Sequence, residues 1–209
     1  MSNNVNNQGL LIVISGPAGA GKGTVTGLLQ QTGDFVCSVS ATTRAPRPGE
    51  IDGVHYRYIS ADDFRERIAT GGMLEYTEYC GNYYGTPRRE ALEVLASGKN
   101  LILEIEVDGA MQVKRQFPEA VLIMLLPPSY AEQEARLRGR ATETEEKILA
   151  RLDQAKRELP HLPEYDYVVY NTDHNERACA DDVLAIVRAE RCATRRHPTD
   201  AQDYFCKSV

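Results

Sequence analysis

The stretch Leu10-Leu-Ile-Val-Ile14, followed at once by Ser15-Gly-Pro-Ala-Gly-Ala-Gly-Lys-Gly-Thr24, decides the fold class of this chain. Residues 10–14 are apolar and mostly β-branched, which is typical of a strand buried on both faces. The segment from Lys22 to Gln30 then has helical spacing, with apolar side chains on one side. A strand, a glycine-rich loop and a helix in this order form the context of a Walker A phosphate-binding loop.

We expect this loop to hold the phosphates of a nucleoside triphosphate. Backbone N–H groups and the start of the helix attract a polyphosphate, and Lys22 can reach its outer phosphates. Gly23 stands where such loops normally place a hydroxyl for Mg²⁺, and Thr24 supplies one a position later. The variant Gly-Lys-Gly-Thr also occurs in adenylate-kinase-like loops. The predicted loop comprises Gly16, Pro17, Ala18, Gly19, Ala20, Gly21, Lys22, Gly23 and Thr24.

The rest of the chain alternates between strand and helix patterns. Further strands are expected at 101–107, 121–126 and 167–170, and helices at 86–97, 108–116 and 129–139. This alternation predicts an α/β fold, a P-loop core with a mostly parallel sheet flanked by helices. Two segments interrupt it: residues 40–84 are expected to form an inserted lobe, and residues 139–157 a charged helix.

Composition excludes several classes of protein. The 24 basic and 30 acidic side chains give a net charge of −6, which argues against a protein that coats nucleic acid. The longest apolar run is far shorter than the roughly 18 residues that span a bilayer, and the polar start lacks a secretory leader. We therefore expect a cytoplasmic protein without a membrane partner. The five scattered cysteines indicate reduced thiols.

A second anion site is expected in the segment Ser40-Ala-Thr-Thr-Arg-Ala-Pro-Arg-Pro-Gly-Glu50. Its prolines are unsuited to a helix, so the guanidinium groups of Arg44 and Arg47 can converge on one small anion. Tyr56 and Tyr84 can add O–H donors to the same anion.

Three stretches after the P-loop resemble the guanylate kinase family: Ser40 to Gly53, Gly81 to Thr86, and Gly139 to Glu145. The similarity covers roughly residues 10–188 and includes a long motif peculiar to that family. It implies an ATP:GMP phosphotransferase that also takes dGMP, acts in purine nucleotide metabolism and GMP recycling, and uses Mg²⁺ with ATP. The implied domain spans 8–190, with its core in 8–39, 87–138 and 159–190, a GMP-binding lobe in 40–86, a lid in 139–158, and polar tails in 1–7 and 191–209.

The resemblance also assigns residues to each substrate. Arg44, Arg47, Tyr56 and Tyr84 correspond to the positions that hold the GMP phosphate, and Ser40, Glu75 and Thr86 to those that hold guanine. Arg140 and Arg151 correspond to lid arginines on the ATP phosphates, with Arg136 close by, and Asn171 corresponds to an adenine-side contact. Among these, Lys22, Arg44, Arg140 and Arg151 are the predicted catalytic residues. These four residues and Arg47 are expected to converge on one cleft and to give it a local positive charge.

The family's acidic pair, usually Asp-x-Asp, is Glu104-Ile-Glu106 here. We expect both carboxylates on one face of a strand, near its carboxyl end. Either they orient the phosphate-binding arginines or they hold water on Mg²⁺, and a structural ion pair is an open alternative. Glu104 is placed with the GMP-binding residues, and Thr24 or Glu106 could contact Mg²⁺ through water.

Two other functions remain open from the sequence. One is a different nucleoside monophosphate kinase, as the Gly-Lys-Gly-Thr loop permits. The other is a catalytically inactive guanylate-kinase-like scaffold module, against which the intact Gly21-Lys22 pair argues. A monomer and a homodimer are both compatible with the sequence.

Overall fold

The computed structural model of the chain describes residues 8–79, 81–139, 144–172 and 175–197. Its strands are β1 (Leu11–Ser15), β2 (Phe35–Cys37), β3 (Ala41–Thr42), β4 (Arg57–Tyr58), β5 (Met73–Tyr79), β6 (Asn82–Pro87), β7 (Asn100–Glu104), β8 (Val121–Leu126) and β9 (Tyr167–Tyr170). Its helices are α1 (Lys22–Gln30), α2 (Ala61–Ala69), α3 (Arg88–Ala96), α4 (Val107–Gln116), α5 (Tyr130–Gly139), α6 (Glu145–Glu158) and α7 (Glu176–Arg191), with 3-10 helices η1 (Leu159–Glu164) and η2 (Thr194–Arg196).

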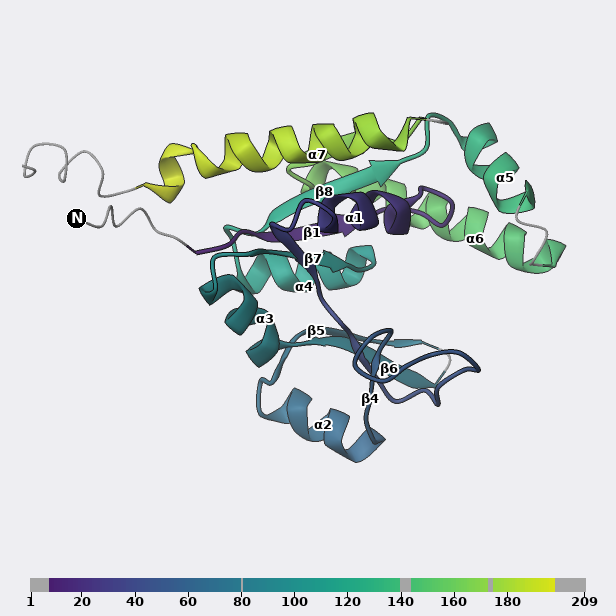
Figure 1. Cartoon of the computed structure of the whole chain (residues 1–209). Helices are drawn as coiled ribbons and strands as arrows, with labels where there is room; N and C mark the ends of the chain where they lie inside the picture. The colour runs from purple at the N-terminus through teal and green to yellow at the C-terminus, as the bar shows by residue number, and fades with distance from the viewer. Residues whose placement is uncertain (1–7, 80, 140–143, 173–174, 198–209) are drawn as a thin grey trace, which may run out of the picture.

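The central sheet has five parallel strands in the order β2-β7-β1-β8-β9. Side chains of β1 and β8 alternate between two hydrophobic cores, one on each face. Ile12 and Ile14 face the core formed with α1 and α7, whereas Leu11 and Val13 face the core formed with α3, α4 and η1. Figure 1 shows α7 and α1 on one side of the sheet and α4 and α3 on the other. The predicted α/β fold is confirmed, because strands buried on both faces need helices on both sides.

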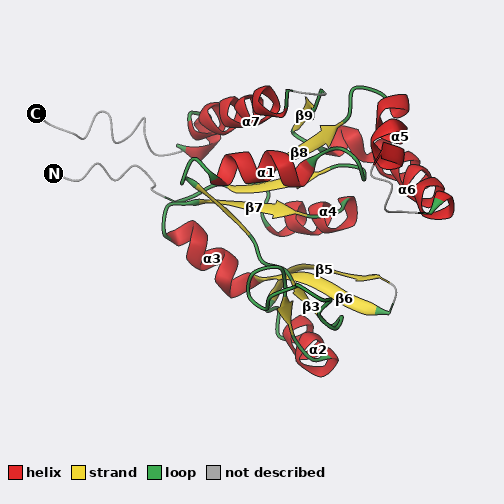
Figure 2. Ribbon diagram, turned by 45° about the vertical axis from the view of Figure 1, so that its right-hand side comes forward, coloured by secondary structure: helices red, strands yellow, loops and turns green. Residues whose placement is uncertain are grey.

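The part of the chain that runs from β2 to β7 forms a second sheet, with strand order β4-β3-β6-β5. Its own small core contains Ala41, Phe64 and Met73, with Phe64 supplied by α2. Figure 2 shows this sheet and α2 beneath the main sheet, while α5 and α6 lie together at one end of the molecule. Leu137, Ile148 and Leu152 bring α5 and α6 together in a further cluster.

Residues of the predicted site lie together at the carboxyl ends of the parallel strands. Ile14 pairs in register with Glu104, and Leu126 with Tyr170. The loop after β1, the end of β7 and the residue after β9 therefore meet at one edge of the sheet. This is the edge where open α/β sheets bind ligands.

Two expectations from the sequence need comment. The expected strand 101–107 ends at Glu104, and Glu106 is the N-cap residue of α4. The placement of both carboxylates on one strand was therefore wrong, because the chain already turns into a helix at Glu106. Within the described ranges, no helix is long and apolar enough to cross a membrane.

Candidate active site

The loop after β1 has the backbone of a phosphate cradle. Gly21 is the N-cap residue of α1 and has φ 86° and ψ 21°, in the left-handed region that favours glycine. A Cβ atom at Gly21 would lie 2.2 Å from Nδ2 of Asn171. At Gly16, where φ is 154°, a Cβ would lie 2.0 Å from the carbonyl oxygen of Leu125. Both positions are thus restricted to glycine by conformation and by space.

Lys22 lies at the centre of the loop, and its Nζ donates to the carbonyl oxygen of Gly16 at 2.6 Å. Burial lowers the pKa of this lysine, while the carboxylates of Glu104, Glu158 and Glu106 act in the opposite direction. The positive charge of Arg151, from α6, adds to the lowering. Lys22 therefore lies where charges from β7, the start of α4 and α6 all act on it.

Asn171 and Arg136 join the loop to neighbouring elements. Nδ2 of Asn171 donates to the carbonyl oxygen of Ala20 at 2.8 Å, and its own carbonyl oxygen accepts from Nη2 of Arg136 at 2.8 Å. Gln133, also on α5, donates to the carbonyl oxygen of Ala18 at 3.0 Å. The predicted adenine-side residue thus contacts the P-loop backbone, and Arg136 contacts the backbone carbonyl of that residue. Together with Gln133, these contacts attach α5 to the core.

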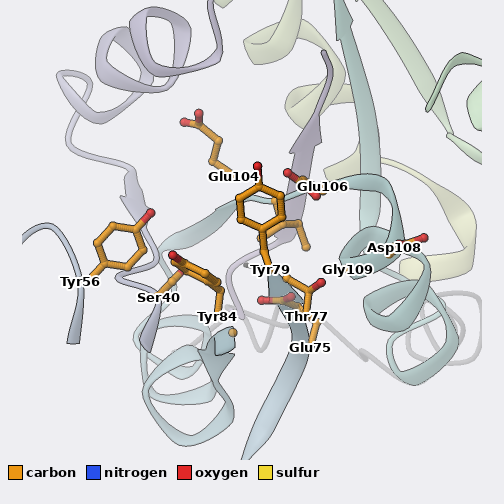
Figure 3. Close-up of a pocket in the computed structure, with 12 residues that line it drawn as sticks. Ser40, Tyr56, Glu75, Thr77, Tyr79, Tyr84, Glu104, Glu106, Asp108 and Gly109 are labelled. Carbon is orange, nitrogen blue, oxygen red and sulfur yellow. The ribbon is translucent and has the colours of Figure 1, made fainter. Parts of the chain in front are cut away.

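A cavity of about 300 Å³ lies between the small sheet and the carboxyl end of β7. Figure 3 shows Glu104 and Glu106 on one side of it and Glu75 and Thr77 on the other. The lining comprises Ser40, Tyr56, Glu75, Thr77, Tyr79, Tyr84, Gly85, Glu104, Ile105, Glu106, Asp108 and Gly109. Five predicted GMP-binding residues therefore line one space, although they are up to 64 positions apart in the chain (104 − 40).

Glu75 is a buried carboxylate in this cavity, with 4% of its surface exposed. Its Oε1 accepts a hydrogen bond from the hydroxyl of Thr86 at 2.7 Å. Burial raises the pKa of Glu75, and the hydrogen bonds from Thr86 partly oppose that rise. A Cβ atom at Gly109 would lie 2.9 Å from Oε2 of Glu75. Gly109 thus leaves room beside the second carboxylate oxygen, and both residues line the cavity.

Arg44 lies beside the cavity and is held by Glu50. Its Nη2 donates to both carboxylate oxygens of Glu50, at 2.8 and 3.0 Å, and its Nη1 donates to the carbonyl oxygen of Ala45 at 2.7 Å. The guanidinium lies 5.4 Å from the centre of the Tyr56 ring. Arg47 approaches the same carboxylate through its backbone N–H, at 2.7 Å.

The expected convergence of positive charge is not found in the cavity lining. It contains four carboxylates, and none of Lys22, Arg44, Arg47 and Arg151 lines it. The physical reason at Arg44 is its ion pair with Glu50. Arg140, the remaining predicted lid arginine of this group, lies outside the described residues.

Several residues of the site were missed by the sequence analysis. Thr26 donates to Oε2 of Glu104 at 3.3 Å, so this hydroxyl, two positions after Thr24, faces the acidic pair. Glu50 closes the quoted arginine segment, where an acid three residues after Arg47 was the available signal. No local pattern pointed to Gly109, because its role depends on Glu75, 34 positions earlier (109 − 75).

The donor set suits a magnesium ion that arrives with ATP. Glu104 and Glu106 both line the cavity, and both charges act on Lys22. Carboxylate oxygens are ligands that Mg²⁺ prefers, usually with water and substrate phosphates completing its shell. In the described part of the chain no three His, Cys, Asp or Glu residues form a metal cluster.

The sequence was then compared with known proteins. The guanylate kinase family model matches residues 8–188. The chain belongs to the guanylate kinase family. It is 53% identical over 190 residues to the guanylate kinase of Halalkalibacterium halodurans, covering 90% of this chain and 92% of that protein. It is 49% identical over 193 residues to the guanylate kinase of Desulfitobacterium hafniense, covering 92% and 96%.

A solved structure supports the same family. The crystal structure of guanylate kinase from Anaplasma phagocytophilum has a TM-score of 0.71 and 33% sequence identity, and the match covers 91% of this chain and 90% of that one. The resemblance inferred from the three guanylate kinase stretches is therefore confirmed. The roles of individual residues and the division into core, lobe and lid stay predictions.

Proposed function

We propose that this member of the guanylate kinase family transfers the γ-phosphoryl group of ATP to GMP, giving ADP and GDP. The observation that carries the proposal is the buried carboxylate of Glu75, 4% exposed, in a cavity that extends to Glu104 beside the P-loop. Guanine presents a ring N–H and an exocyclic amine side by side, and one carboxylate can accept both. Adenine lacks this donor pair, so it would leave the buried charge of Glu75 unpaired.

The proposed division of labour follows from position. Lys22 and the start of α1 hold the donor phosphates, and the cavity holds GMP with its base at Glu75. Arg44, Arg47, Tyr56 and Tyr84 hold the acceptor phosphate, and Ser40 and Thr86 complete the guanine site. The charges of Arg140 and Arg151, from the proposed lid, and of Arg136, beside it on α5, neutralise the phosphoryl oxygens, which is the main demand of this reaction. The acceptor oxygen of GMP is already anionic, so the proposal includes no general base.

Magnesium enters the proposal only with ATP. When bound, it neutralises charge on the donor phosphate oxygens. Glu104 and Glu106 would hold it through water, and the hydroxyl of Thr26 keeps the carboxylate of Glu104 in place. We propose the same catalytic arrangement for dGMP, because none of the contacts argued above involves the ribose 2′-hydroxyl.

Turnover of GMP, AMP, CMP and UMP in an ADP-release assay with ATP and Mg²⁺ tests the proposal. We expect GMP to be the preferred acceptor. Faster turnover of AMP would identify a different nucleoside monophosphate kinase. Absence of both turnover and ATP binding would identify a scaffold module.

The role of Glu75 has its own test. In Glu75→Gln, the amide keeps the size of the side chain but replaces one acceptor oxygen with a donor, so it no longer matches the two donors of guanine. We expect kcat/KM for GMP to fall by about 10-fold to 100-fold, since hydrogen bonds to charged groups contribute about 1.5–3 kcal/mol. Glu78→Gln is the matched control, because Glu78 lies on the same strand and is exposed. Unchanged selectivity in a folded Glu75→Gln protein would contradict the proposed guanine site.

A further inference from the structure

The carboxylate of Glu50 accepts hydrogen bonds from three residues and has no role in the reaction proposed above. Its carboxylate accepts from Nη2 of Arg44, from the backbone N–H of Arg47 at 2.7 Å and from the hydroxyl of Tyr58 at 2.8 Å. The ion pair with Arg44 is largely shielded from solvent, with side-chain exposures of 16% and 17%. The arginine segment and strand β4 therefore meet at one carboxylate.

Glu50 stays ionised under all conditions in which the protein would work. The hydrogen bond from Arg44, followed by those from the Arg47 backbone and Tyr58, lowers its pKa to about 2. One of its three partners, the backbone N–H of Arg47, is independent of the Arg44 side chain. The carboxylate is therefore anchored to the lobe itself, and it remains in place if Arg44 turns.

The position of Arg44 follows from this anchor. Glu50 engages only its Nη2, whereas a guanidinium carries five N–H donors. Ala45 accepts from Nη1, and the Tyr56 ring lies against the guanidinium, with its centre 5.4 Å away. Because Tyr56 also lines the cavity, Arg44 is kept at the cavity's edge without filling it. A long side chain held in one place loses less conformational entropy when it binds an anion.

We propose that Glu50 is a positioning residue for GMP: it holds Arg44 in the orientation that receives the nucleotide's phosphate. This inference rests on the proposed role of Arg44 in holding that phosphate. Glu50 itself does not touch the substrate, and its effect passes through Arg44 alone.

A double-mutant cycle on the full chain tests this inference. KM and kcat are measured for GMP at saturating ATP, and KM for ATP at saturating GMP, in wild type, Glu50→Gln, Arg44→Met and the double variant. We expect Glu50→Gln to raise KM for GMP by roughly 10-fold, the effect of one charge-assisted contact, and to leave KM for ATP unchanged. In the Arg44→Met background, Glu50→Gln should have no further effect on KM for GMP. Glu66→Gln, which removes the same charge from an exposed position on α2 of the same lobe, is the control.

Three results would overturn the inference. An unchanged KM for GMP in Glu50→Gln means that Glu50 does not position Arg44. A lower KM means that Glu50 competes with the phosphate for Arg44. Effects that add in the double variant, or that raise both KM values together, mean that Glu50 only stabilises the lobe.

A second variant tests the inference if the Glu50→Gln protein does not fold. Tyr58→Phe removes a hydroxyl that interacts with both Glu50 and Arg44 and leaves both charges. KM for GMP should therefore rise in the same direction but less, and an unchanged value there overturns the inference too. If the wild type instead turns over another nucleoside monophosphate, the proposed function fails. The same cycle with that nucleotide still tests Glu50, because it carries the same phosphate.

Discussion

Glu75 combines a favourable role in recognition with an unfavourable one in stability. In the proposed guanine site its ionised form matches the two donors of the base, but burial raises its pKa, and Thr86 only partly offsets the loss of water. Without nucleotide, the buried charge therefore destabilises the folded state. Strained or poorly solvated groups of this kind are common where binding requires them.

The pH dependence of stability should reveal this cost. A carboxyl whose pKa is higher in the folded than in the unfolded state makes its full contribution below the unfolded value and loses it as pH rises through the folded value. We therefore expect nucleotide-free Glu75→Gln to have a higher Tm than wild type at neutral pH, and the difference to shrink as pH falls toward about 4, near the unfolded pKa of glutamate. Thermal unfolding measured across this range checks it, with Glu78→Gln as control; a gap that widens on acidification would contradict it.

Because Gly109 has no Cβ atom, it leaves space for the carboxylate of Glu75 in the proposed guanine site. In Gly109→Ala, the new methyl would approach Oε2 of Glu75 to 2.9 Å, closer than real Cβ contacts allow. We expect the carboxylate to be displaced and kcat/KM for GMP to fall by at least about 10-fold, because a displacement of about 1 Å disturbs a positioned site strongly. Gly27→Ala, whose methyl would meet no atom within 4 Å, is the matched control. Equal GMP kinetics in the two variants would show that the site tolerates the methyl group.

At the scale of elements, α1 both begins within the P-loop and packs as a helix, and its glycines do not favour the helix. Its first residues belong to the P-loop, and the helix carries glycine at positions 23 and 27. Glycine in a helix interior is less stable than alanine because it loses more backbone entropy. Gly16 and Gly21, in the loop, have a reason to be glycine, since both have positive φ and close neighbours, whereas a Cβ at Gly23 or Gly27 would meet no atom within 4 Å.

Two alanine substitutions with equal room should therefore have opposite effects. Gly27→Ala should raise the free energy of unfolding by about 0.5–1 kcal/mol, as expected for a helix interior. Gly33→Ala also meets no atom within 4 Å, but its φ of +82° lies in the left-handed region, so it should lower stability by about 1 kcal/mol. Urea unfolding of the two variants measures both values. Effects of the same sign would show that the helix, or the turn after it, does not have the expected backbone energetics.

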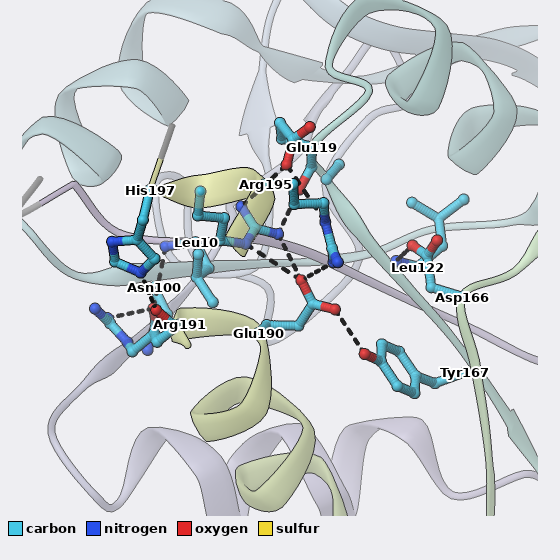
Figure 4. Close-up of polar contacts among 12 residues, drawn as sticks. Leu10, Asn100, Glu119, Leu122, Asp166, Tyr167, Glu190, Arg191, Arg195 and His197 are labelled. Atoms are coloured by element: carbon cyan, nitrogen blue, oxygen red, sulfur yellow. Dashed lines mark hydrogen bonds and ion pairs between the residues drawn. The ribbon is translucent and has the colours of Figure 1, made fainter. Parts of the chain in front are cut away.

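At the scale of the whole molecule, the two edges of the main sheet have different tasks. The proposed site lies at the carboxyl edge. At the amino edge, the end of α7 and the 3-10 helix η2 hold neighbouring strands together. Glu190 accepts from the hydroxyl of Tyr167 at 2.6 Å and from Nη2 of Arg196 at 2.8 Å, and Arg195 also contacts it (Figure 4). Nη2 of Arg196 further donates to the carbonyl oxygen of Glu119, just before β8. This network stabilises the sheet far from the cavity.

Removing one member of the network should separate stability from catalysis. Arg196→Met takes a partner from a carboxylate that is 2% exposed, so we expect the free energy of unfolding to fall by about 1–3 kcal/mol. KM for GMP should not change. Arg188→Met, exposed on α7, is the control for loss of one positive charge. A changed KM with unchanged stability would contradict this division between the two edges.

Local sequence patterns were sufficient to predict much of this protein. The strand 121–126, the helix 22–30 and the P-loop are encoded in consecutive residues, whose spacing follows the period of a strand or helix. The family was recognisable for a similar reason, because its motifs are contiguous stretches, and the family comparison confirms it. The residue roles at Lys22, Arg44 and Glu75 stay predictions that the experiments above test.

Contacts between distant residues were decided only by the folded chain. The end of β7 at Glu104 and the space that Gly109 leaves for Glu75 depend on how separate elements pack, and the pairing of Arg44 with Glu50 depends on the path of one loop. An ion pair or a close approach has no periodicity, and its energy depends on burial and distance, which neither composition nor spacing specifies. For this reason neither composition nor spacing showed that the cavity is lined by carboxylates, or that Glu50 holds Arg44 at its edge.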